Sequence, residues 1–120
     1  MTKSDLLAGR RILVVEDDFF IAEDMVATLA AAGVEVVGPA STVSAALGLI
    51  EEADRLDAAV LDVNLQGEMA YPLADALVAR AVPFMFATGY DRGALPARFA
   101  GVTVCEKPLT LSQVARAMWG

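Results

Sequence analysis

The chain has 120 residues, enough for one domain with a hydrophobic core, and 57% of them are hydrophobic, which argues against intrinsic disorder. A formal net charge of −7 argues against nucleic-acid binding, because that function needs a basic surface. No apolar run reaches the roughly 18–20 residues of a membrane helix, and the N-terminal residues are too charged for a signal peptide, so we expect a cytoplasmic protein without membrane contact.

The first predicted elements are a buried strand and a helix. Residues 11–16 form an apolar run that ends in an acid, which is typical of a strand covered on both faces. Good helix formers over residues 19–32 predict a helix, with Asp17 or Asp18 as its N-cap and Gly33 at its C-terminus.

A second strand and helix follow. Residues 34–37 predict a strand, which Gly38-Pro39 should end. Ser41 or Thr42 is suited to begin a helix that runs to about Ala53. This alternation of strand and helix favours a parallel sheet.

The third predicted strand, within residues 58–64, is the one around which the chain is organised. Apolar residues lead directly into Asp62, and turn chemistry at Gly67 follows. A buried parallel strand delivers Asp62 to the carboxyl edge of the sheet, where open α/β folds place their sites. Taken alone, Asp62 could equally cap a helix or begin a turn.

The rest of the chain continues the alternation. Pro72 marks the first turn of a helix, which Leu73, Leu77 and Ala81 continue at helical spacing. The remaining predicted elements are strands at 83–87 and 102–105, a short or irregular fourth helix within 91–100, and a last amphipathic helix through Leu111, Val114, Ala115 and Met118.

Five strands thus alternate with helices, without a repeat, a low-complexity tract or a linker. The pattern predicts a single domain over residues 1–120, with about residues 1–9 as a lead-in and no output domain. We expect an α/β fold with a doubly wound, flavodoxin-like sheet of five parallel strands in the order 2-1-3-4-5. In that order the switch point lies between strands 1 and 3.

Chemically active side chains follow four of these strands. Glu16 and Asp17 end the first strand, Asp62 the third, Thr88 the fourth and Lys107 the fifth. Because the carboxyl ends of parallel strands share one edge, these side chains should converge. Two unit charges about 4 Å apart repel by roughly 4 kcal/mol at an effective dielectric constant near 20, so the carboxylates need a cation besides the lysine.

The available ligands limit which cation this is. Oxygen ligands alone, few in number, favour Mg²⁺ over Ca²⁺. The chain has no histidine and one cysteine, which excludes a zinc cluster and histidine-based acid–base chemistry. Cys105 lies in an apolar run, and we interpret it as core packing rather than as a redox residue.

Four short segments together resemble the CheY-like receiver domain of two-component response regulators. They are residues 12–17, 61–64 and 87–89 and the Lys107-Pro108 pair, in that order along the chain. The resemblance covers essentially the whole chain. Residues 83–90 also resemble the FATGUY subgroup, which consists largely of stand-alone receivers that pair with alphaproteobacterial histidine kinases.

The resemblance implies that Asp62 accepts a phosphoryl group in a two-component phosphorelay. Thr88 would donate a hydrogen bond to a phosphoryl oxygen, and Lys107 would pair with the phosphate and the carboxylate. The donor would be a phosphohistidine on a sensor histidine kinase or a histidine phosphotransfer protein. The output would be contact with a downstream protein, made by a monomer or weak dimer; alternatively, the chain would act as a phosphate sink or relay.

The resemblance also implies a ligand set for Mg²⁺. Asp17 and Asp62 would bind the metal directly, the backbone carbonyl of Asn64 would be a further ligand, and Glu16 would act through water. Asp18 is an additional acid that we expect at a helix N-terminus rather than at the metal.

The chain departs from the receiver pattern at Val104, where many receivers carry an aromatic switch residue that moves inward on phosphorylation. Tyr90 is the nearest aromatic residue that could replace it; alternatively, Tyr90 is a partly exposed loop residue. Trp119 could contribute to a contact surface or pack at the end of the last helix.

Two alternatives stand beside a phosphorylated receiver. A degenerate receiver would act as a docking module without phosphorylation, but the complete set of acids, Thr88 and Lys107 argues against it. An aspartyl-phosphate phosphohydrolase would commonly carry a second acid two residues after its nucleophile, where this chain has Asn64. We therefore predict a signalling protein and not an enzyme.

Overall fold

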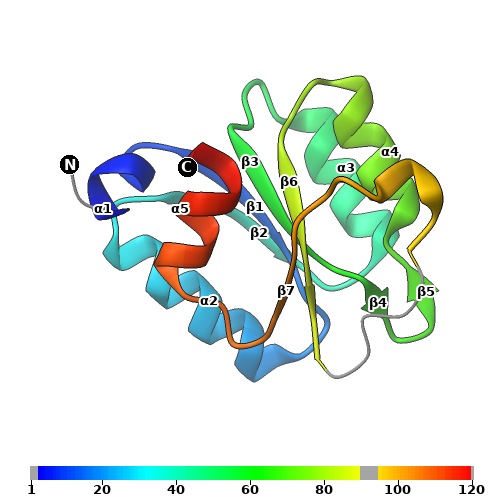
Figure 1. The fold of residues 1–120 in the computed structure, drawn as a ribbon, viewed down its shortest axis with the longest axis horizontal. Coiled ribbons are helices and arrows are strands. Elements are labelled where there is room, and N and C mark those ends of the chain that lie inside the picture. Colours follow the sequence, from blue (N-terminus) through cyan, green and yellow to red (C-terminus); the bar gives the residue numbers. More distant parts are fainter. Residues whose placement is uncertain (1–2, 90–94, 120) are drawn as a thin grey trace.

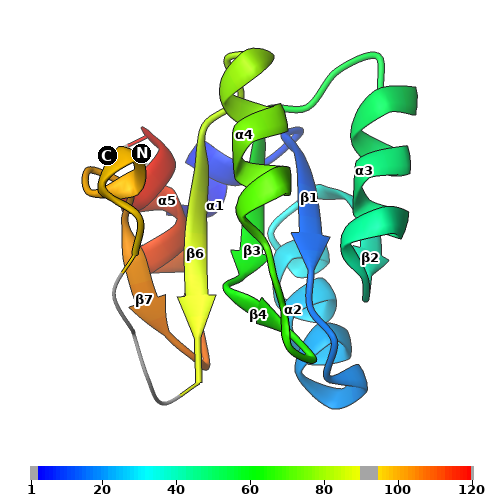
Figure 2. The ribbon, with the colours of Figure 1, turned by 90° about the vertical axis from the view of Figure 1, so that its right-hand side faces the viewer.

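The main sheet has five parallel strands in the order β2-β1-β3-β6-β7, in a computed structural model that describes residues 3–89 and 95–119 (Figure 1). Counted along the chain, this order is 2-1-3-4-5, so the predicted flavodoxin-like arrangement is confirmed. The arrows of β1, β3, β6 and β7 in Figure 2 point the same way, which brings the carboxyl ends of the parallel strands to one edge. The strands are β1 (Arg11–Val15), β2 (Glu35–Ala40), β3 (Ala58–Asp62), β6 (Phe84–Thr88) and β7 (Val104–Glu106).

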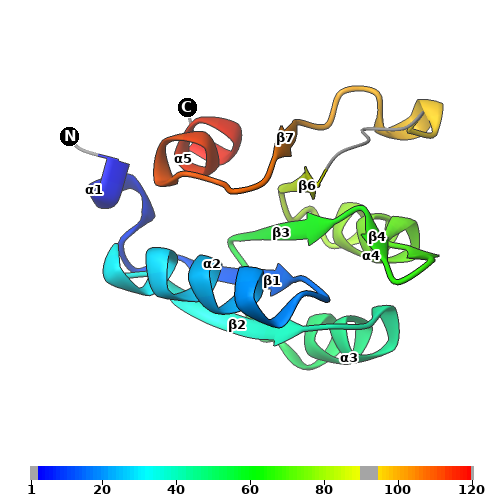
Figure 3. The same cartoon turned by 90° about the horizontal axis from the view of Figure 1, so that it is seen from below.

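Helices cover both faces of the sheet (Figure 1 and Figure 3). One face carries α2 (Phe19–Ala31) and α5 (Leu111–Trp119), and the other carries α3 (Val43–Glu52) and α4 (Tyr71–Ala79). A short or irregular fourth helix was predicted within residues 91–100. In the part of this range that the structure describes, residues 95–100, the helical element is a single 3-10 turn, η1 (Ala97–Phe99). None of the described helices combines the length and the apolar character that crossing a membrane requires.

Each face of the sheet buries its own hydrophobic cluster, because side chains alternate along a strand. In β1, Leu13 and Val15 pack with α3 and α4, whereas Ile12 and Val14 pack with α2 and α5. All residues of β3 are buried, as expected for the central strand. This burial holds Asp62 in place at the end of the strand.

β2 continues through Gly38-Pro39, so the predicted strand end at Val37 is wrong. Leu13 is aligned with Val37 and Val15 with Ala40, which means that β2 accommodates one extra residue as a bulge. The Gly38-Pro39 peptide bond is cis. β2 lies at the edge of the sheet, where the missing N–H of proline is tolerated.

α4 begins with Pro72 in its first turn, as predicted, but it ends at Ala79. Ala81 adopts a φ of 57°, so the prediction that it continues the helix is wrong. The N–H of Ala81 donates to Val78 and that of Val82 to Leu77, which is the Schellman pattern of a helix end. Glycine usually occupies this position, so the alanine in the sequence did not indicate that the helix ends here.

The segment after β3 forms a hairpin that the sequence did not predict. It consists of β4 (Asn64–Leu65) and β5 (Glu68–Met69), paired antiparallel. Gln66 and Gly67 at its turn have φ values of 55° and 94°, as a two-residue type I′ turn requires.

The predicted N-terminal lead-in contains a short helix, α1 (Lys3–Leu7), that packs beside α5 (Figure 1). Leu7 is fully buried in the same cluster as α2 and α5. The Arg10 guanidinium lies 4.5 Å from the centroid of the Trp119 ring. Trp119 and Cys105 are both half-buried against this cluster, which favours the packing interpretation of each.

We expect Leu7→Ala to lower the free energy of unfolding by about 3 kcal/mol, because it removes a fully buried leucine side chain. Urea unfolding followed by circular dichroism measures the change. Val78→Ala on α4 is the control, since Val78 is 61% exposed and its loss should change stability by less than about 0.5 kcal/mol. Equal effects of the two substitutions would show that α1 does not dock on the domain.

Candidate functional site

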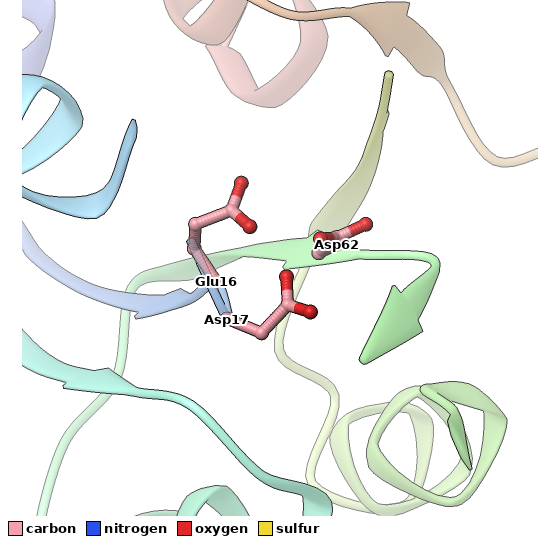
Figure 4. Close-up of side chains that lie close together, drawn as sticks. All are labelled: Glu16, Asp17 and Asp62. Atoms are coloured by element: carbon pink, nitrogen blue, oxygen red, sulfur yellow. The ribbon is translucent and has the colours of Figure 1, made fainter. Parts of the chain in front are cut away.

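Three carboxylates meet at the carboxyl edge of β1 and β3 (Figure 4). One oxygen each from Glu16, Asp17 and Asp62 lies within 4.8 Å of the others. The two strands are neighbours, with Val15 aligned with Leu61, so the residues that follow lie side by side. Glu16 and Asp62 are buried and Asp17 is partly exposed. The predicted convergence of these acids is confirmed.

Lys107 joins two of these carboxylates. Its Nζ donates to Glu16 Oε1 at 2.6 Å and to Asp62 Oδ2 at 3.1 Å, and its side chain is 11% exposed. Its backbone N–H donates to the carbonyl of Thr88 at 2.8 Å, which ties the residue to the end of β6. The Lys107-Pro108 peptide bond is cis. One ammonium group faces three carboxylates, so negative charge remains in excess.

The pKa values reflect this excess. Burial raises the pKa of Glu16 to about 7, against the lowering effect of the Lys107 ammonium. Burial alone would lower the pKa of Lys107, but its hydrogen bonds to Glu16 and Asp62 raise it. Burial also acts to raise the pKa of Asp17, yet hydrogen bonding with the other two carboxyl groups lowers it overall. A further cation would favour the ionised form of all three acids.

The residues of this site fit a hard divalent cation. The donors are carboxylate oxygens, which Mg²⁺ prefers, and they are close enough to share one ion. Asp18 is engaged elsewhere: its Oδ1 accepts hydrogen bonds from the N–H groups of Phe20 and Ile21, at 3.0 Å each. It is therefore the N-cap of α2, as the sequence predicted.

Thr88 and Asn64 lie at the same edge. Thr88 is the last residue of β6 and is buried, and the preceding Ala87 is aligned with Asp62. The N–H of Asn64 donates to Asp62 Oδ1 at 3.3 Å. The structure thus brings both residues next to the acceptor candidate. The roles of the Thr88 hydroxyl and the Asn64 carbonyl stay predictions.

The two switch candidates differ in what the structure shows of them. Val104 lies in β7, aligned with Phe86, and packs partly buried against the cluster on the α3–α4 face. Tyr90 lies outside the described residues. A switch role for either residue stays a prediction.

A groove of about 640 Å³ adjoins the acidic cluster. Its lining includes Asp17, Gly89 and Lys107 beside the cluster, and apolar side chains of α2 and α5. Gln66, from the turn of the β4–β5 hairpin, also lines it. The sequence predicts no role for Gln66, because a single glutamine before a glycine is ordinary in a loop; its position after Asp62 is the one signal that it offers.

Comparison with known proteins identifies relatives by structure. No protein-family model matches the chain, and no curated protein matches it either. The chain is 42% identical to SdrG from Sphingomonas melonis Fr1, with a TM-score of 0.79 over 90% of this chain and 92% of that one. The BeF3-activated conformation of SdrG, from Pseudomonas melonis Fr1, gives 41% identity and a TM-score of 0.74, over 92% and 93% of the two chains.

Two further structures carry the name of the class. The N-terminal domain of a response regulator/sensory box/GGDEF protein from Carboxydothermus hydrogenoformans is 25% identical, with a TM-score of 0.74 over 90% of each chain. A response regulator receiver protein from Sinorhizobium medicae WSM419 is 20% identical, with a TM-score of 0.72 over 91% of this chain and 90% of that one, and shows the shared fold.

The parallel sheet, with its acids and lysine gathered at the carboxyl edge, defines a signalling module of the receiver class. The identity to SdrG over nearly the full length of both chains makes the assignment specific. The chain belongs to the family of response regulator receiver domains, as the four sequence segments predicted.

Proposed function

We propose that this chain accepts a phosphoryl group on Asp62 from a phosphohistidine of a separate protein and signals that state through protein–protein contacts. The observation that carries the proposal is the placement of Asp62. Its Oδ2 accepts from Lys107 Nζ and its Oδ1 from the N–H of Asn64, beside two further carboxylates. An acid held in this way is oriented and partly neutralised before any donor arrives.

The geometry supports phosphoryl transfer because that reaction mainly needs positioning and charge neutralisation. An oxygen of Asp62 forms a bond to phosphorus while the bond from phosphorus to the donor imidazole nitrogen breaks. The Lys107 ammonium, 3.1 Å from Asp62, offsets the charge that accumulates there. Mg²⁺ bound by Asp17, Asp62 and the Asn64 carbonyl, with Glu16 acting through water, would supply further neutralisation of the phosphoryl oxygens.

The partners follow from the composition of the chain. These 120 residues contain no histidine, so the phosphohistidine would lie outside them, on a sensor histidine kinase or a histidine phosphotransfer protein. The resemblance of residues 83–90 supports membership of the FATGUY subgroup. The existence of a BeF3-activated conformation of the related SdrG supports an acceptor site that responds to a small anionic group.

Incubation with acetyl phosphate and Mg²⁺, followed by intact mass measurement, tests the proposal directly. Gain of the mass of one phosphoryl group is the expected result. The same mixture without Mg²⁺ should give little or no modified protein.

We expect Asp17→Asn to weaken Mg²⁺ binding by about tenfold or more, because it removes a charged ligand from a cluster that shares one ion. Isothermal titration calorimetry with MgCl₂ measures the dissociation constant. Asp24→Asn is the matched control: Asp24 is an exposed acid that lines the same groove but lies outside the three-carboxylate cluster. Equal affinities in the two variants would place the metal elsewhere.

A further inference from the structure

The turn of the β4–β5 hairpin holds a glutamine in an unusual backbone conformation. Gln66 and Ala81 are the non-glycine residues with positive φ in the described part of the chain. Ala81 is accounted for by the end of α4. The type I′ turn requires the positive φ of Gln66, but asparagine or glycine would meet that requirement with less strain. A conformation of this kind, next to a site, suggests that the side chain has a use there.

The hairpin holds this glutamine in a defined place. Leu65 is 4% exposed and anchors β4 in the core on the α3–α4 face. Asn64 Oδ1 accepts a hydrogen bond from the N–H of Gly67 at 2.6 Å, which closes the turn. At the base, the N–H of Ala70 donates to the carbonyl of Val63 at 2.9 Å. The turn is therefore attached on both sides to the residues that follow Asp62.

Gln66 lines the groove together with Asp17, Gly89 and Lys107, which come from the ends of three strands around Asp62. Gln66 is an exposed residue, so it lies on the solvent side of this part of the groove.

The other neutral polar side chains that line the groove are less suited to act at Asp62. The Thr110 hydroxyl accepts a hydrogen bond from the N–H of Gln113 at the start of α5. Thr28 lies far along α2, roughly 15 Å from Asp17 by the rise of the helix. Among the described residues that line the groove, Gln66 is therefore the one with a carboxamide side chain.

This inference rests on the function proposed above. We propose that Gln66 positions the water molecule that hydrolyses phosphorylated Asp62, and so sets how long the phosphorylated state lasts. The water oxygen forms a bond to phosphorus while the bond between phosphorus and the Asp62 oxygen breaks. The products are the Asp62 carboxylate and dihydrogen phosphate, which keeps both protons of the water. The side-chain oxygen of Gln66 accepts a hydrogen bond from the water, and its amide donates to a phosphoryl oxygen.

A carboxamide suits this task for an electrostatic reason. It offers a donor and an acceptor without charge, whereas a carboxylate at the same place would repel both the phosphoryl group and the three acids. A glutamine that orients an attacking water is also a known device in nucleotide hydrolysis.

The test compares Gln66→Ala and Gln66→Leu with the wild-type chain. Each protein is phosphorylated with acetyl phosphate and Mg²⁺, the donor is removed, and loss of the phosphoryl mass is followed over time. We expect both variants to lose the phosphoryl group about tenfold more slowly, the effect of one lost hydrogen bond. Phosphorylation by acetyl phosphate should be slowed less than hydrolysis, because only hydrolysis uses the positioned water. Glu68→Ala, an exposed position on the same hairpin, should behave as wild type.

The outcomes separate the possible roles of the side chain. Faster loss in Gln66→Ala would mean that the glutamine shields the phosphoryl group, and would overturn the proposal. Loss at the wild-type rate would overturn it as well. Phosphorylation and hydrolysis slowed by the same factor would indicate a structural role instead. A wild-type chain that gains no phosphoryl group would refute the proposed function itself, a result distinct from all of these.

Discussion

Asp62→Asn is expected to abolish phosphorylation of the chain by acetyl phosphate in the presence of Mg²⁺. The substitution replaces a carboxylate nucleophile by an amide of nearly the same size, so the chemistry is lost and the packing is kept. The fold should persist, because Lys107 still pairs with Glu16 at 2.6 Å and one carboxylate fewer reduces the repulsion in the cluster. Intact mass measurement should show one added phosphoryl group in the wild type and none in the variant.

Asp54→Asn is the control for this experiment, because Asp54 is an exposed aspartate between α3 and β3. It should take up the phosphoryl group as the wild type does. A phosphoryl group on Asp62→Asn would place the acceptor at another residue. A wild-type chain that stays unmodified would support a degenerate receiver, and turnover of a generic phosphate ester would support a phosphohydrolase.

Lys107→Met is expected to have the largest effect on stability. It removes the ammonium between Glu16 and Asp62 and leaves two buried carboxylates without their cationic partner. Loss of one partner of a buried ion pair lowers the free energy of unfolding by about 3 kcal/mol or more. Because the pKa of Glu16 is already raised to about 7, part of this loss will be relieved by proton uptake at that residue.

Urea unfolding in metal-free buffer measures the effect of Lys107→Met. Arg98→Met is the comparison, since Arg98 also forms two hydrogen bonds to a carboxylate, Asp75, at 3.0 Å each. That pair is exposed on both sides and should contribute far less. A similar loss in both variants would show that burial does not distinguish the two ion pairs. The same Lys107→Met protein should also accept the phosphoryl group much more slowly.

The parallel sheet and the side chains at its carboxyl edge were predictable because a single sequence pattern indicates both. Apolar runs that end in an acid, a hydroxyl residue or a lysine mark buried parallel strands, and parallel strands bring their carboxyl ends to one edge. The strand ends therefore predicted that Asp62, Lys107 and the Glu16–Asp17 pair lie together, as the structure shows. The N-caps were predictable to within two adjacent residues for a local reason: the side chains of Asp18 and Thr42 accept hydrogen bonds from the first N–H groups of their helices.

The features that were missed depend on tertiary contacts that local patterns do not show. α1 is too short to have a periodic pattern, and Leu7 is buried only because α5 lies beside it. β2 passes through Pro39 because it is an edge strand, which the sequence does not state. Gln66 in the β4–β5 hairpin and Ala81 at the end of α4 both have left-handed backbone conformations. Glycine or asparagine usually occupies such positions, so glutamine and alanine did not indicate them.

The contact between α1 and α5 brings the first and last described helices together at the amino edge of the sheet, away from the acids (Figure 1). A short peptide could therefore join the two ends covalently, and new ends could be opened in an exposed loop without passing near Asp62. A circularly permuted chain of this design would keep the arrangement of Glu16, Asp17, Asp62 and Lys107 while carrying a reporter at a chosen loop.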